Sequence, residues 1–240
     1  MLIAIFWGGL AAASLLVGFY LSSLGLSNRT VGMIMGFGGG ALLSAIAYEL
    51  VPKSAGGGWF AGVAFLVGAL TFFVADWIID RRGGNDRKDI EGNKPGGSGS
   101  AIFIGTLLDN VPESIILGMG LAVGGAINTA FLVAVFVSNL PEGVAGTLNL
   151  SLAGRSRRDI FWMWTWLVVI SAACAGFGYL MIGWFPGASG LYAQAFAAGA
   201  MLTMLADAMM PEAYEHGGKL VGLITVSGFL VAAFLSALEV

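Results

Sequence analysis

Residues 101–121, AIFIGTLLDNVPESIILGMGL, form an apolar run long enough to cross a bilayer as a helix, yet they carry Asp109 and Glu113 at their centre. A second run at 130–150, AFLVAVFVSNLPEGVAGTLNL, holds Ser138-Asn139-Leu140-Pro141-Glu142, so the pattern Asn-x-Pro-Glu occurs twice. A charged side chain at mid-membrane costs about 2.5–3.5 kcal/mol on insertion scales. Because both copies accept this cost, the repeated pattern predicts a site that handles an ion.

The overall composition is that of a polytopic membrane protein. Of the 240 residues, 58% are hydrophobic and 10% are charged, whereas a soluble domain carries about 25% charged residues. The single cysteine, Cys174, excludes an internal disulfide and a cysteine metal cluster, and no basic stripe suggests a nucleic-acid partner. The first ten residues lack a positively charged segment, so we expect a retained first span rather than a cleaved signal.

Hydropathy predicts an all-α membrane protein with eight transmembrane helices, forming one transporter domain over 1–240. The predicted spans are about 2–25, 30–51, 58–80, 100–122, 126–149, 159–184, 190–213 and 218–238. All connections are short except 81–100, RRGGNDRKDIEGNKPGGSGS, whose Gly, Ser, Pro and mixed charges predict a flexible cytoplasmic loop.

The positions of the basic residues predict the orientation in the membrane. Ten of the eleven Lys and Arg residues fall in one set of alternate connections, and Lys53 alone falls in the other set. Because cytoplasmic loops carry the excess of Lys and Arg, the first set is expected to be cytoplasmic and both termini to face outward. We therefore expect a multi-pass protein of the plasma (cell inner) membrane.

A second, weaker internal repeat relates residues 40–52 to residues 199–211, with matching small residues and a proline at the end of each stretch. These stretches lie in the second and seventh spans, which run in opposite directions. Spans 1–3 and 6–8 would then form an inverted repeat around spans 4 and 5, a 3+2+3 arrangement typical of transporters. The alternative is a chance alignment of two helices that are both rich in Gly and Ala.

The polar residues of the paired motif are expected to converge. Positions i and i+4 share a helix face, and two antiparallel neighbours place both motifs at one depth. Pro112 and Pro141 also free the carbonyls of Leu108 and Val137 from their helical donors. The predicted ligands of a divalent cation are Asp109, Asn110, Glu113, Asn139 and Glu142, with Ser138 as a weaker candidate. The alternative is two proline kinks whose acids bond to neighbouring helices.

The paired motif, the eight spans, the outward termini and the long connection between the third and fourth spans resemble the ZIP (zinc- and iron-regulated transporter-like) family. The stretches GALLSAIAYELVP at 40–52 and GAMLTMLADAMMPE at 199–212 are similar to the family's second and seventh helices. The resemblance covers essentially the whole chain. It implies transport of divalent metal ions towards the cytoplasm, with the metal centre between the fourth and fifth helices.

Three departures from the family pattern bear on the choice of ion. Asp109 stands where the family usually has His, and Ser138 stands where it commonly has His or Gln. The sixth span has no carboxylate in FWMWTWLVVISAACAG, so a second metal position is unsupported. Since oxygen donors suit harder ions than imidazole does, the Asp109 substitution predicts a preference shifted towards Mn²⁺ or Fe²⁺.

Four further polar residues are candidates for the ion pathway. Glu49, near the outer end of the second span, could receive entering ions, although an interfacial carboxylate is more often simply solvated. Asp207 lies within the seventh span, where a pathway or packing role is expected. Glu212 and His216 lie near the cytoplasmic end and could form an exit relay.

Trp162, Trp164 and Trp166 are interpreted as interfacial anchors.

The chain is not expected to be an enzyme, because its single His cannot form the His pair of a membrane metalloprotease. The prediction is a secondary transporter of zinc, iron or manganese ions, with the metal as transported substrate and no cofactor. Its partners are divalent metal ions and the lipid bilayer, and a homodimer is one assembly open to it. Two alternatives remain: a non-transporting metal-binding or sensing protein, and a transporter of protons or another small solute.

Overall fold

The computed structural model describes residues 1–84, 99–184 and 189–238, and every regular element within them is helical. Eight helical stretches are long and apolar enough to cross a membrane, as the hydropathy predicted. They are Leu2–Leu24, Asn28–Leu50, Gly58–Arg82, Gly99–Gly124, Thr129–Leu152, Arg157–Trp184, Gly190–Gly217 and Leu220–Leu238. The chain is therefore an all-helical protein compatible with a multi-pass membrane location.

Several spans are built from more than one helix. The helices, in chain order, are α1 (Leu2–Ala12), α2 (Ser14–Leu21), α3 (Asn28–Ala45), α4 (Val51–Ala55), α5 (Gly58–Ile79), α6 (Gly99–Gly124), α7 (Thr129–Leu152), α8 (Arg157–Trp184), α9 (Ser189–Met204), α10 (Met210–Gly217) and α11 (Leu220–Leu238). The first span consists of α1, α2 and a short 3₁₀ turn, and the seventh consists of α9, a π-helical turn and α10.

The ends of the predicted loop 81–100 are wrong. The third span continues as a π-helical turn over Asp80–Gly84, and α6 already begins at Gly99. The guanidinium of Arg81 lies 3.6 Å from the centre of the Trp77 ring, a cation–π contact that stabilises the extension. Residues 85–98, which make up the rest of the predicted loop, lie outside the described residues.

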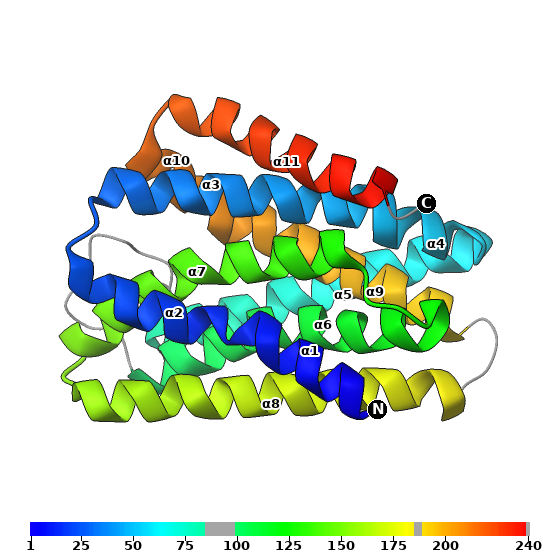
Figure 1. Ribbon diagram of the computed structural model, residues 1–240, viewed down its shortest axis with the longest axis horizontal. Helices are drawn as coiled ribbons and strands as arrows, with labels where there is room; N and C mark the ends of the chain where they lie inside the picture. Colours follow the sequence, from blue (N-terminus) through cyan, green and yellow to red (C-terminus); the bar gives the residue numbers. More distant parts are fainter. Residues whose placement is uncertain (85–98, 185–188, 239–240) are drawn as a thin grey trace.

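The helices form a bundle in which α3, α6 and α7 are central (Figure 1). Within the most apolar window of each span, 67% of the α7 residues are buried, against 17% for α11. The turns before α3, between α7 and α8, and between α10 and α11 lie at one end of the bundle. The turn between α6 and α7, the α4 region and the chain's N-terminal end lie at the other. Connections that are alternate along the chain thus share an end, as antiparallel neighbours require.

Glycines allow α3 and α11 to cross with their backbones in contact. A Cβ atom at Gly40 would overlap the carbonyl oxygen of Thr225, and one at Gly228 would overlap the carbonyl oxygen of Phe37. In lipid, helices associate through this kind of close packing, because the tails are as apolar as the side chains. The crossing therefore depends on both glycines.

The helices α5 and α9 cross in the same manner. A Cβ atom at Gly68 would overlap the carbonyl oxygen of Phe196, and one at Gly199 would overlap the carbonyl oxygen of Phe65. The stretch around Gly199 is the one that aligns in sequence with the stretch around Gly40. The third span thus packs on the seventh through the same kind of paired contact that joins the second to the eighth.

The second and seventh spans share a further irregularity. Each contains a five-residue π-helical turn, Ile46–Leu50 in one and Leu205–Met209 in the other. Pro52 and Pro211 follow directly after these turns, each as the second residue of the next helix. The two stretches aligned in the sequence therefore also match in backbone conformation.

The α5 crossing can be tested with two glycines of the same helix. Gly68→Ala is expected to destabilise the protein by about 1–3 kcal/mol, because the new methyl group forces two backbones apart. Gly62, which is exposed and has no atom within 4 Å of an added Cβ, is the matched control. Gly62→Ala is expected to stabilise the helix by up to about 1 kcal/mol. Equal melting temperatures of the two variants in detergent would contradict the proposed contact.

Candidate functional site

Both copies of the motif lie inside continuous helices. Helix α6 runs through Pro112 and helix α7 runs through Pro141 without a break in either. The polar residues of the motif are all buried, with at most 3% of any of them exposed. They are Asp109, Asn110, Glu113, Ser138, Asn139 and Glu142. All six predicted residues of the paired motif are therefore inside the bundle, on α6 and α7.

A direct hydrogen bond joins the two copies. The side-chain amide of Asn139 donates to Oδ1 of Asn110 at 3.1 Å, and the amide of Asn110 donates to the carbonyl of Thr106 at 3.0 Å. Both asparagines are about 1% exposed. This amide pair fixes the relative depth of α6 and α7, because each motif can reach the other at only one register.

The hydroxyl of Ser138 is used within its own helix. It donates to the carbonyl of Val135 at 2.9 Å, and the residue is fully buried. Helix α3 lies directly against it, since a Cβ atom at Gly38 would be 2.7 Å from the Ser138 Cα. The small side chain at this position therefore serves the contact between α3 and α7, and a larger ligand such as His or Gln would have little room.

Glycine contacts also fix the two motif helices against their neighbours. A Cβ at Gly118 of α6 would overlap the Ala175 carbonyl oxygen of α8. On α7, Gly143 directly follows the motif, and a Cβ there would be 2.5 Å from the carbonyl oxygen of Leu15 in α2. Both motifs are thus held by backbone contacts within a few residues of the acids.

The carboxylates are not gathered into a preformed cluster. Among the described residues, no group of three or more His, Cys, Asp or Glu side chains is arranged to hold a metal ion. What α6 and α7 bring into contact is the amide pair, with the acids of each motif on the same helices. An ion bound here would take amide oxygens as ligands beside its carboxylates, and Asn110 Oδ1 has a second lone pair that could serve while the oxygen accepts the bond from Asn139.

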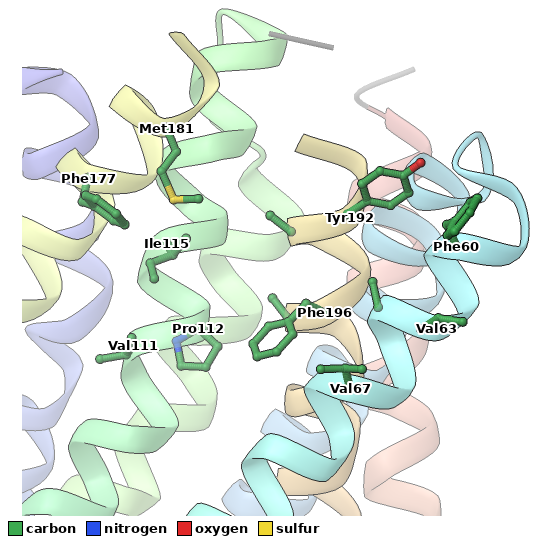
Figure 2. A pocket seen from close by; sticks show the side chains of 13 residues that line it. Phe60, Val63, Val67, Val111, Pro112, Ile115, Phe177, Met181, Tyr192 and Phe196 are labelled. Carbon is green, nitrogen blue, oxygen red and sulfur yellow. The ribbon is translucent and has the colours of Figure 1, made fainter. Parts of the chain in front are cut away.

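The opposite face of the first motif lines an apolar groove (Figure 2). The groove has a volume of about 830 Å³ and separates α6 and α8 on one side from α5 and α9 on the other. Val111, Pro112 and Ile115 form its α6 wall, and the Tyr192 hydroxyl is the one polar side-chain group among its lining residues. The side chains of the α6 wall offer no ligand to an ion, so the polar side chains of the motif in α6 lie on its other face.

The pathway candidates are distributed over the seventh and second spans. Asp207 lies in the π-helical turn of the seventh span and is exposed. Glu212 and His216 pair with each other within α10, where Nδ1 of His216 is 3.1 Å from Oε1 of Glu212. Glu49 is 8% exposed, lies in the π-helical turn of the second span, and accepts a hydrogen bond from the Ser236 hydroxyl.

The interpretation of Trp164 as an interfacial anchor is wrong. Trp162 and Trp166 are 52% and 61% exposed, as anchors would be, but Trp164 is fully buried. Its indole N–H donates to the hydroxyl of Thr147 on α7 at 2.9 Å. Residues spaced two apart on a helix point to different faces, so the three tryptophans cannot share one environment.

The sequence reasoning overlooked two polar residues near the turn between α6 and α7. Asn128 caps α7 by accepting a hydrogen bond from the Phe131 N–H at 2.6 Å. Gln194 of α9 is 6% exposed and lines a small cavity together with Asn128 and Glu49. Gln194 stands in an apolar run of the sequence, and this position could have indicated a polar contact inside the bundle, since a buried amide requires partners.

Comparison of the chain with protein-family models and with curated proteins finds no match. The likeness to ZIP proteins therefore depends on the motif pair and the pattern of spans in the sequence.

The amide pair can be tested by a double-mutant cycle on Asn110→Ala and Asn139→Ala. We expect a coupling energy of about 0.6 kcal/mol, and at most about 1.7, the range found for hydrogen bonds between membrane helices. The measurement is reversible unfolding of the single and double variants in lipid bicelles. Strict additivity of the two single effects would show that the bond contributes nothing to stability.

Proposed function

We propose that this protein is a secondary transporter of divalent metal ions, similar to ZIP proteins, which moves ions towards the cytoplasm between α6 and α7. The observation that carries the proposal is the meeting of two Asn-x-Pro-Glu motifs, through Asn110 and Asn139, at the buried centre of an eight-span bundle. A purely structural helix contact needs no acids beside it. Here Asp109, Glu113 and Glu142 are all buried on the same two helices.

The donor chemistry favours a hard or borderline cation. Every polar side chain of the paired motif offers oxygen, and oxygen donors suit Mn²⁺, Mg²⁺ and Ca²⁺ better than softer ions. With fewer than three acids able to act together, the ion would keep other oxygen ligands, including water. Incomplete coordination by protein suits an ion that must be released again.

We further propose that spans 1–3 and 6–8 form an inverted repeat around α6 and α7. The matched glycine crossings of α3 with α11 and of α5 with α9 support this arrangement, as do the two π-helical turns. Inverted repeats in transporters accompany alternating access to a site near the middle of the membrane. We also propose that the end with the basic turns faces the cytoplasm and that both termini lie outside, in the plasma membrane, because cytoplasmic loops carry the excess of Lys and Arg.

A transporter of protons or another small solute is the second candidate. The observation in its favour is that the described acids and the single His form no group of three around a common point. Buried carboxylates on a central helix pair can serve as proton carriers without any metal. Dependence of the flux on a divalent ion separates this candidate from the first.

The proposal is tested by metal-ion flux into liposomes that contain the purified protein, comparing Zn²⁺, Mn²⁺, Fe²⁺ and Cd²⁺. Glu113→Gln and Glu142→Gln are each expected to reduce saturable flux by at least about tenfold, the equivalent of about 1.4 kcal/mol. Asp159→Asn, an exposed acid outside the motif, is the control and is expected to leave flux unchanged. Proton flux without metal dependence would favour the second candidate, and no flux of either kind would refute transport.

The residue at position 109 is expected to set the ion preference. Asp109→His replaces an oxygen donor by imidazole, which suits zinc better than manganese, so the ratio of Zn²⁺ to Mn²⁺ flux should rise. The measurement is competition between the two ions in the same liposomes. Identical competition profiles for the wild type and the variant would contradict a ligand role for Asp109.

A further inference from the structure

A small cavity with three polar residues in a mainly apolar lining lies beyond the motif, towards the turn that joins α6 and α7. Its volume is about 30 Å³, and four of the central spans contribute to its walls. The lining residues are Glu49, Leu50, Ile116, Leu117, Gly120, Asn128, Phe131 and Gln194. A cavity needs about 10–15 Å³ in this measure to hold one water-sized particle, so this cavity has room for a small ion but not for an organic solute.

The amide of Gln194 marks this cavity as a place for a ligand. Gln194 is 6% exposed, and its Oε1 is buried without a hydrogen-bond partner. An unsatisfied buried oxygen is unfavourable unless something binds to it. The carboxylate of Glu49 lines the same cavity while accepting a hydrogen bond from Ser236 of α11, which holds it in place. Asn128, the cap of α7, completes the polar part of the lining.

The lining residues that come from α6 and α7 lie along these helices between the motif and the turn that joins them. Leu117 follows Glu113 by one helical turn, which is a rise of about 6 Å. Leu50, Leu117 and Phe131 are all less than 4% exposed and belong to the apolar part of the cavity wall, together with Ile116 and Gly120. An ion that moved from this cavity towards the motif would therefore leave a partly apolar wall.

We propose that this cavity is a cation subsite on the outward side of the motif, in which the Glu49 carboxylate and the Gln194 amide oxygen are the ligands. The inference rests on the proposed function, because it assumes that cations approach the motif from this end. One carboxylate and neutral oxygens favour a hard divalent ion such as Mn²⁺. The single charge makes the subsite weaker than a site with two acids, so an ion held there can move on.

The π-helical turn Ile46–Leu50 gives the subsite its position. Such turns insert one residue into a helix and rotate the side chains that follow, and they are frequent at functional sites. Glu49 is the acidic residue of this turn, and only 8% of it is exposed. The sequence alone placed Glu49 near the membrane surface, whereas the fold places it inside the bundle beside Gln194.

The test is a titration of the purified full-length protein with Mn²⁺, in which loss of the free-ion electron paramagnetic resonance signal counts the bound ions. The wild type is expected to show two classes of site. Glu49→Gln and Gln194→Leu should each weaken the weaker class by about tenfold or abolish it and leave the stronger class intact. Gln194→Glu adds a charge and should tighten the weaker class by about tenfold. Glu113→Gln/Glu142→Gln should remove the stronger class alone.

The outcomes distinguish failure of the subsite alone from failure of the proposed function. If the Glu49 and Gln194 variants bind Mn²⁺ as the wild type does while the Glu113/Glu142 variant loses an ion, the subsite is refuted and the metal site at the motif stands. If no variant differs and no saturable binding occurs, the proposed function fails and the subsite with it. A merely structural Gln194 would show a higher melting temperature after Gln194→Leu with unchanged binding, which also refutes the subsite. Asp159→Asn is the matched charge-removal control.

Discussion

Backbone-to-backbone contact at glycine is the constraint on which this bundle depends. Water drives no association of helices inside a bilayer, so the contacts must come from close packing. The crossings at Gly40, Gly68, Gly118 and Gly143 supply it, because none of them could carry even a methyl group without displacing a neighbouring helix. Gly118 and Gly143 act on the two motif helices themselves. The position of the polar centre therefore follows from where small residues allow helices to touch.

The polar centre is held in turn by its amide pair. The bond between Asn110 and Asn139 satisfies one amide oxygen and one amide donor in a place that water does not reach. Packing of Gly38 on Ser138 adds a steric limit on one side. The depth and spacing of α6 at the motif are therefore set by one polar contact, and those of α3 by one steric contact.

The two faces of α6 have different physical characters. One face carries Asn110 and contacts α7, while the face with Pro112 lines an apolar groove of about 830 Å³ against α5 and α9. The small cavity, lined by Ile116, Leu117 and Gly120, lies on the same side of the helix as Asn110 and Glu113. Under the proposed function, a hydrated ion would follow this side, because Glu49, Gln194 and the motif provide oxygen there and the larger groove is apolar.

The sequence by itself determined the eight helical spans and the burial of both motifs, because length and apolar composition decide whether a segment can cross a membrane. It misplaced the ends of the 81–100 loop and the environment of Trp164, and it did not predict the partner of the Ser138 hydroxyl or the cavity beside Gln194. The reason is physical. In a helix that is apolar all round, hydrophobicity does not tell which face meets protein and which meets lipid. Only the packing of the helices decides that, and with it which polar residues share a cavity.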